Sequence, residues 1–299
     1  MQAGIFYAAA AHLMWGVFPL YFRALQSIDP LEMLMHRIVW SAGFVALIWI
    51  YKREWRWLLD ALRQPRVVLI FAASAVLLSL NWFVYIYAVH SGHVVEGSLG
   101  YFINPLVNIL LGMIFLRERL RNVQWVAILL ASFGVFWLTW QVGYFPWIAL
   151  ILALSFGTYG LLRKIAPLAT LEGLTLETLL LFPFALACLY WLVYQQHSPQ
   201  QHSTFVTAAA SIQMLLVAAG PITAIPLLCF AAAARRISLA TLGVMQYIGP
   251  TLQLLIGVWV LDEPFGQARL VGFILIWIAL LLYAVEGLWR YRRTINLNH

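Results

Sequence analysis

Residues 99–138 read LGYFINPLVNILLGMIFLRERLRNVQWVAILLASFGVFWL, and residues 244–283 read VMQYIGPTLQLLIGVWVLDEPFGQARLVGFILIWIALLLY. Four positions match between the two stretches at a constant offset of 145 residues: Pro105 with Pro250, Gly112 with Gly257, Leu116 with Leu261, and Glu118 with Glu263. The chain is therefore an internal duplication that carries one copy of the pattern near the end of each half.

The two copies differ in their flanking charge. Arg117, Arg119 and Arg121 surround the first glutamate, whereas Asp262 precedes the second, where the nearest cation is Arg269. Because lysine and arginine favour the cytoplasmic side of a membrane, the two turns are expected on opposite sides of a bilayer. An inverted repeat of this kind is typical of membrane transporters.

The composition indicates an integral membrane protein. Of 299 residues, 64% are hydrophobic and 10% are charged, and the mean hydropathy is +0.87. Soluble domains are only about 45–50% apolar. We predict an all-α integral membrane fold with ten transmembrane helices in two inverted five-helix repeats, residues 1–142 and residues 143–299, the second ending in a short cytoplasmic tail. The predicted spans are Gly4–Phe22, Leu31–Tyr51, Val67–Val89, Val94–Leu116, Val123–Gln141, Tyr144–Leu162, Glu172–Tyr194, Ile212–Ala234, Ile237–Leu261 and Ala268–Trp289.

The repeat also extends to the start of each half. Trp15-Gly16 matches Phe156-Gly157, and Arg23 matches Lys164, each 141 residues apart. Because each half holds five spans, an odd number, the second half must run opposite to the first, which is the condition for a pseudo-two-fold axis in the membrane plane.

The net charge of +7 indicates orientation rather than a nucleic-acid partner. Fifteen of the 18 lysines and arginines lie in alternate loops or in the tail, and these face one side if both termini are cytoplasmic. Such residues contact the anionic headgroups of the bilayer. The loop 52–66 has Trp55, Leu58, Leu59 and Leu62 at helical spacing and is predicted to form a short amphipathic helix on the membrane surface.

Polar residues inside the spans are the candidates for function, because they are costly in hydrocarbon and usually face a bundle interior or a cavity. In the fourth span Glu96, Gly100, Asn104 and Asn108 recur every four residues and form one stripe. Pro105 lies within this stripe and is expected to break the helix.

The ninth span repeats this arrangement with Gly249, Pro250 and Gln253, and Gln246 lies one turn earlier. Two proline-interrupted helices related by a pseudo-two-fold axis indicate a substrate site near the middle of the bilayer, where Asn104 and Gln253 are expected to face each other. The alternative is that these amides only join helices by hydrogen bonds.

Other spans add further candidate binding residues. His12 and Trp15 share a face of the first span, Asn81 and Tyr85 share a face of the third, and Tyr101 belongs to the fourth. Aromatic residues make up 15% of the chain, which suits belts at the membrane interface and also a cavity for aromatic or cationic solutes.

Arg37 in the second span requires a partner, because a cation in hydrocarbon is costly. Glu96 fits best by depth, and Glu32 and Glu177 are the other acids within vertical reach. Such a pair could be purely structural, or it could act in gating and proton coupling; the sequence leaves both roles open.

No metal or cofactor site is predicted. His90 and His93 lie three residues apart without a further ligand, and Cys188 and Cys229 are separate residues inside apolar spans. The sequence has no Walker-type loop for ATP and no metalloprotease or hydrolase motif.

Several segments also resemble a known family. Residues 37–41 (RIVWS), 98–106 (SLGYFINPL), 118–120 (ERL) and 124–125 (QW) are similar to the RarD, or chloramphenicol-sensitive protein, family. This family is a branch of the EamA group in the drug/metabolite transporter superfamily. The resemblance implies ten helices in inverted repeats, a bacterial inner-membrane location and a central cavity, but it implies no set of binding residues.

The leading hypothesis is secondary transport of a small metabolite or amphipathic organic compound by alternating access, with export as the expected direction and protons as a candidate coupling ion. An intramembrane enzyme and a passive channel or non-transporting scaffold are the alternatives. The enzyme hypothesis lacks a paired acid and base or a metal motif on facing helices, and a channel would require no inverted duplication.

Overall fold

The structure, a computed structural model, describes residues 2–90, 94–141, 145–195, 205–260 and 267–296. Within these ranges every regular element is an α-helix, which confirms the predicted fold class. The elements are α1 (Gln2–Gly16), α2 (Phe18–Ala24), α3 (Pro30–Lys52), α4 (Arg56–Leu62), α5 (Pro65–His90), α6 (Val94–Leu116), α7 (Asn122–Trp140), α8 (Trp147–Ile165), α9 (Thr170–Gln195), α10 (Ala210–Ala234), α11 (Leu239–Gln246), α12 (Ile248–Val260) and α13 (Gln267–Asn296).

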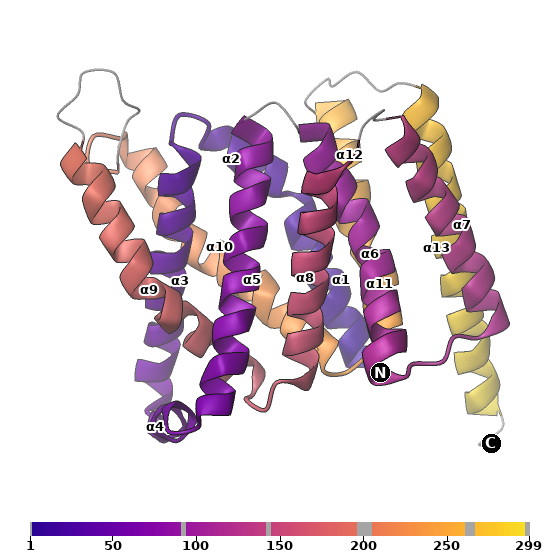
Figure 1. The fold of residues 1–299 in the computed structure, drawn as a ribbon, viewed down its shortest axis with the longest axis horizontal. Coiled ribbons are helices and arrows are strands. Elements are labelled where there is room, and N and C mark those ends of the chain that lie inside the picture. Colours follow the sequence, from indigo (N-terminus) through magenta and orange to yellow (C-terminus); the bar gives the residue numbers. More distant parts are fainter. Residues whose placement is uncertain (1, 91–93, 142–144, 196–204, 261–266, 297–299) are drawn as a thin grey trace.

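In the described part of the chain, ten helical stretches are long and apolar enough to cross a bilayer, as the sequence predicts. Eight of them are single helices, whereas the first consists of α1 and α2 and the ninth of α11 and α12. The helix α4 lies between the second and third spans, where the amphipathic helix was predicted. Figure 1 shows it end-on, across the direction of the upright spans.

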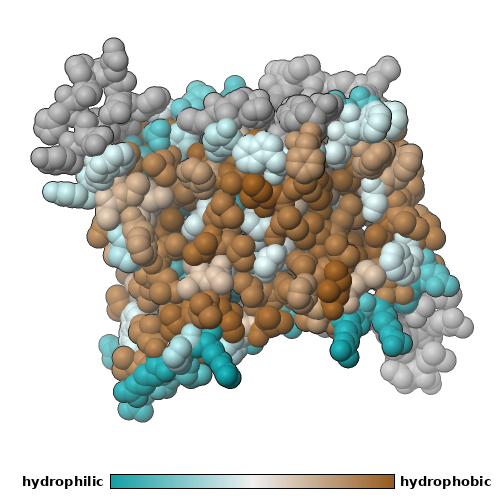
Figure 2. Space-filling view, in the orientation of Figure 1, coloured by the Kyte–Doolittle hydropathy of each residue, from teal (hydrophilic) through white to brown (hydrophobic). Residues whose placement is uncertain are grey.

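The start of α1 and the end of α13 lie at the same end of the bundle (Figure 1). We call this the terminal end and the opposite one the distal end. A broad apolar band covers the middle of the molecule, and hydrophilic residues gather most strongly along the terminal end (Figure 2). This surface is the one expected of a protein that crosses a membrane several times.

The two halves run in opposite directions. α1 leaves the terminal end, whereas α8, the first helix of the second half, leaves the distal end (Figure 1). Trp15 and Phe156, which the repeat matches, contact each other with ring centroids 5.6 Å apart. Because a residue close to a two-fold axis meets its own counterpart, this pair marks the pseudo-axis between the halves.

Two glycines permit close helix contacts that position the interior of the bundle. A Cβ atom at Gly16 would lie 2.6 Å from Leu252 Cδ2, so the first span packs directly against α12. A Cβ atom at Gly220 would clash with the carbonyl oxygen of Trp40. Ser41 Oγ donates a hydrogen bond to the Gly220 carbonyl oxygen at 3.3 Å, so polar side chains one turn away on α3 and α10 can meet.

One of the two predicted helix breaks is present, and the other is not. α11 ends at Gln246, and α12 begins two residues before Pro250. Pro105, in contrast, lies inside α6, and the helix continues past it. The break predicted at Pro105 is therefore wrong. Proline removes only one backbone donor, and neighbouring helices can compensate for that loss in a membrane protein. A break absent from the prediction lies at Val17, two residues before Pro19.

Candidate functional site

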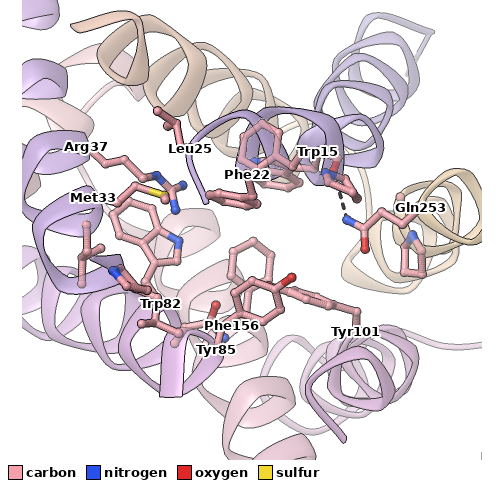
Figure 3. Close-up of a pocket in the computed structure, with 18 of the residues that line it drawn as sticks. Trp15, Phe22, Leu25, Met33, Arg37, Trp82, Tyr85, Tyr101, Phe156 and Gln253 are labelled. Carbon is pink, nitrogen blue, oxygen red and sulfur yellow. Dashed lines mark hydrogen bonds between the residues drawn. The ribbon is translucent and has the colours of Figure 1, made fainter. Parts of the chain in front are cut away.

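A cavity of about 430 Å³ lies between the two halves, within the size range of small-molecule sites. It extends from His12 and Phe156 in the middle of the bundle to Gln26, which is exposed at the distal end. Figure 3 shows part of its lining. Eleven of the residues singled out from the sequence line it: His12, Trp15, Arg37, Asn81, Tyr85, Tyr101, Asn104, Gln246, Gly249, Pro250 and Gln253.

An amide chain joins three helices beside the cavity. Asn104 Nδ2 donates to the Ala153 carbonyl oxygen of α8 at 3.1 Å. Asn108 Nδ2 donates to Asn104 Oδ1 at 2.9 Å and to Gln246 Oε1 at 2.5 Å. Asn108 is fully buried outside the cavity, whereas Asn104 and Gln246 line it. The amides therefore do join helices, and two of them also present polar atoms to the cavity.

The third span supports the same wall. Asn81 Nδ2 donates to the Leu152 carbonyl oxygen at 2.9 Å and to Ser155 Oγ at 3.0 Å, both on α8. The Tyr85 ring meets the Tyr101 ring edge-on, with centroids 5.5 Å apart. Since these residues also line the cavity, its wall is held by hydrogen bonds and ring contacts between α5, α6 and α8.

Gln253 satisfies a backbone group that proline leaves without a donor. Pro19 has no N–H, so the Trp15 carbonyl oxygen, four residues earlier, lacks its helical partner. Gln253 Nε2 donates to this oxygen at 3.0 Å, a hydrogen bond drawn in Figure 3. The broken first span and the broken ninth span are therefore joined at the cavity.

Aromatic rings close the cavity toward the terminal end. Phe230 packs behind the lining residues, 5.1 Å from Phe156 and 5.9 Å from Tyr159 between ring centroids. His12 is 3% exposed and lies 5.3 Å from Trp15 between ring centroids. We call the rings of His12, Trp15, Phe156, Tyr159 and Phe230 the aromatic floor. The structure gives His12 Nε2 no hydrogen-bond partner among the described residues, so this floor carries one unpaired nitrogen.

Polar groups tie the terminal end together beyond this floor. Glu118 Oε1 and Oε2 accept hydrogen bonds from the backbone N–H groups of Leu239 at 2.8 Å and Ala240 at 3.1 Å, in the first turn of α11. Lys164 Nζ donates to the Ile237 carbonyl oxygen at 2.5 Å and lies 4.0 Å from Glu118 Oε1. We call Glu118 and Lys164 the terminal clamp, because they hold the ends of α6 and α8 against the α10–α11 connection.

Arg37 points its guanidinium group into the cavity, beside Trp82 (Figure 3). Arg37 Nε donates to Thr223 Oγ1 at 3.0 Å, one turn from the close contact between α3 and α10. The guanidinium carbon lies 4.4 Å from the Trp82 ring centroid and 5.8 Å from those of Phe18 and Phe22. These ring faces stabilise a cation that is only 8% exposed.

The carboxylate predicted to pair with this arginine was Glu96, whose side chain lies outside the described part of the structure. The other two acids contact different residues. Glu32 Oε1 lies 3.7 Å from His36 Nε2, and Glu177 Oε1 lies 3.4 Å from Arg163 Nη1. The described lining of the cavity contains no aspartate or glutamate, and the arginine is its one formally charged side chain.

Sequence reasoning missed part of the aromatic lining, namely Phe18, Phe22, Trp82 and Phe156. Phenylalanine and tryptophan are frequent in every span, so composition does not separate those that line a cavity from those that face lipid. The sequence did contain one signal for Phe156 and one for the helix break that follows Gly16. The repeat matches Phe156 with Trp15, and Pro19 follows Gly16 at a spacing that suits a helix break.

The chain as a whole is similar to known transporters. The model of the EamA-like transporter family matches the chain twice, over residues 2–140 and 145–285, once in each half. A crystal structure of a protein with 18% identity superposes with a TM-score of 0.70, covering 95% of this chain and 98% of that chain, which shows a shared fold.

Named relatives match over nearly their full length. An uncharacterized transporter of Pseudomonas aeruginosa is 43% identical over 295 residues, which are 99% of this chain and 97% of that relative. Protein RarD of Escherichia coli strain K12 is 42% identical over 293 residues, 98% of this chain and 97% of the relative. A chloramphenicol-sensitive protein RarD of Pseudomonas aeruginosa is 32% identical over 283 residues, 93% and 92% of the two chains.

Proposed function

Since this chain belongs to the EamA-like transporter family, in the branch of the RarD proteins, we propose that it is a secondary transporter of a small metabolite or amphipathic organic compound and works by alternating access. One observation carries the proposal. The cavity is lined by residues of both halves, reaches the distal end at Gln26, and is closed toward the terminal end by the aromatic floor. A site between two inverted halves is what alternating access requires.

The two ends of the bundle differ in the way that such a cycle predicts. At the terminal end, the ring of Phe230 and the terminal clamp lie between the cavity and the surface. In the opposite conformation these contacts would separate, and the distal end would close around the ligand. The inverted repeat supports this exchange, because each half can adopt the arrangement that the other half has now.

Charge supports an orientation with the terminal end in the cytoplasm of a bacterial inner membrane. Basic residues of the described loops and helix ends gather there, whereas Arg23 and Arg269 belong to helices at the distal end. The residues at the terminal end are Lys52, Arg53, Arg56, Arg63, Arg66, Arg117, Arg119, Arg121, Arg163, Lys164, Arg235 and Arg236. In this orientation the cavity opens to the periplasm, and an exporter would release its substrate from this conformation.

Reconstitution in liposomes tests the proposal. The purified full chain is offered radiolabelled small organic acids, amines and neutral amphipathic compounds, with and without an imposed pH gradient. Counterflow, in which unlabelled compound inside the vesicle drives entry of labelled compound, is the expected result, because it requires one site that faces the two sides in turn. Flux without counterflow would indicate a channel, and chemical conversion of the compound would indicate an enzyme; either result would refute the proposal.

A further inference from the structure

We propose that the cavity takes a small organic anion, whose carboxylate pairs with the Arg37 guanidinium while a planar apolar body lies against the aromatic rings. This inference rests on the proposed function, because it names the ligand class of the same cavity. It replaces the broader expectation of aromatic or cationic solutes with one charge type.

The charge of the described lining disfavours cationic solutes. Among the described lining residues Arg37 is the one with a formal charge, and it is buried from bulk water at 8% exposure. A second cation beside it would be repelled strongly, because charges interact more strongly in a site of low dielectric constant. An anion would instead form a neutral pair and offset the cost of burying the guanidinium group.

The hydrogen-bonding capacity of Arg37 favours the same ligand. A guanidinium group has five N–H donors, and Nε uses one of them on Thr223 Oγ1. No described residue is an acceptor for Nη1 or Nη2. A carboxylate accepts two parallel hydrogen bonds from the end of a guanidinium group, which is the geometry that arginine matches best.

The surroundings hold this arginine in place before any ligand arrives. Three rings, those of Trp82, Phe18 and Phe22, lie within 5.8 Å of the guanidinium carbon, and Thr223 fixes the Nε edge. A preorganised donor loses little side-chain freedom when it binds, so more of the interaction contributes to affinity.

The rest of the cavity fits an apolar body with few polar groups. Trp15, Tyr101 and Phe156 supply ring faces and edges against which a planar ligand can pack. Asn104 lines the same space, and His12 Nε2, which is unpaired among the described residues, could meet a second polar atom near the floor.

Isothermal titration calorimetry of the detergent-purified full chain tests this inference with matched probes. One series is indole-3-acetate, indole-3-acetamide and tryptamine; the other is phenylacetate, phenylacetamide and phenethylamine. Each series keeps the ring and changes the head group from carboxylate to neutral amide to ammonium. We expect the carboxylate of at least one series to bind at least about tenfold more tightly than its amide. Hydrogen bonds between two charged groups are stronger than those to a neutral amide, and the difference corresponds to an affinity ratio of this size.

Two variants assign the preference to one side chain. In Arg37→Gln the ratio of carboxylate to amide affinity should fall to about one, because the charge is gone. Arg23→Gln is the matched control: it removes the same charge from an exposed residue at the same end that does not line the cavity, and it should retain the ratio. A preference that survives in Arg37→Gln would overturn the assignment.

The comparison of the three head groups uses the wild-type chain alone, so its result does not depend on whether a variant folds. The inference would be refuted if, in both series, the amide or the amine bound as tightly as the carboxylate or more tightly. It would also be refuted if neither carboxylate bound. Binding in detergent is also independent of transport. A chain that prefers the carboxylate but shows no counterflow would refute the proposed function alone, and a transporter that prefers amines would refute only the anion assignment.

Discussion

At the scale of single residues, the amide chain separates two roles that a polar side chain can have inside a membrane protein. Asn104 and Asn108 lie one turn apart on the same face of α6 and share a hydrogen bond. Only Asn104 lines the cavity. The same substitution can therefore be made at Asn104, which can contact a ligand in the cavity, and at Asn108, which cannot.

We predict that Asn104→Leu lowers transport about tenfold, the effect of one lost ligand hydrogen bond of about 1.4 kcal/mol. Membrane expression should persist, because an interhelical hydrogen bond contributes only about 0.6 kcal/mol on average. Counterflow and size-exclusion profiles are the measurements. Asn108→Leu is the control and should keep more transport at similar expression. Equal transport in both variants would leave Asn104 with a packing role alone.

A second prediction at this scale concerns Gln253 and the carbonyl group that Pro19 leaves without a donor. Gln253→Leu should lower the free energy of unfolding by about 0.6 kcal/mol, the average measured for such bonds in membrane proteins, and by at most about 1.7 kcal/mol. In a Pro19→Ala background residue 19 regains an N–H for the Trp15 carbonyl oxygen, so the same change should cost less. Unfolding in mixed micelles yields the double-mutant cycle, and an additive cycle would contradict the explanation.

At the scale of elements, hydropathy was sufficient for the ten spans but not for the breaks within them. Long apolar segments can be identified without knowledge of their neighbours. The effect of a proline depends on what surrounds it: α6 continues through Pro105, whereas the first span breaks at Val17, before Pro19. Buried polar residues could be found from sequence because they are costly in hydrocarbon, but aromatic lining residues such as Trp82 could not.

The terminal clamp carries a prediction about these elements. The Glu118 carboxylate accepts two hydrogen bonds from backbone N–H groups of α11. Removing this carboxylate deletes both bonds, so the closed terminal end should open about tenfold more often. Ala8 is fully buried on α1 near that end. In a background with Cys188 and Cys229 replaced by alanine, Ala8→Cys should react faster with a thiol reagent when Glu118→Ala is added.

The matched control for the clamp is Glu172→Ala. Glu172 also lies at the terminal end, but its carboxylate accepts a hydrogen bond from Ala169 N beside its own helix α9 and contacts no other span among the described residues. This variant should leave the reactivity of the introduced cysteine unchanged. An equal increase in both variants would mean that general loosening, and not release of the clamp, exposes the site.

At the scale of the whole molecule, the bundle has two chemically distinct ends, and its orientation can be measured. Ser27 is exposed at the distal end and Asp60 is exposed on α4 at the terminal end. We predict that a membrane-impermeant maleimide labels Ser27→Cys in intact cells and labels Asp60→Cys only after the cells are broken. The opposite pattern would place the terminal end outside and reverse the proposed direction of release.

The contact between Trp15 and Phe156 has a kinetic consequence. Its two rings lie close to the pseudo-axis, 5.6 Å apart, so in the proposed alternating-access cycle each would occupy the place of the other when the halves exchange their arrangements. A contact common to both end states cancels from the equilibrium between them, since only differential interactions shift a population. We therefore predict that the pair affects the rate of the cycle and not the balance between its end states. Substitutions there should change how fast the two states interconvert, while the resting bias is determined by off-axis contacts such as Glu118 with α11.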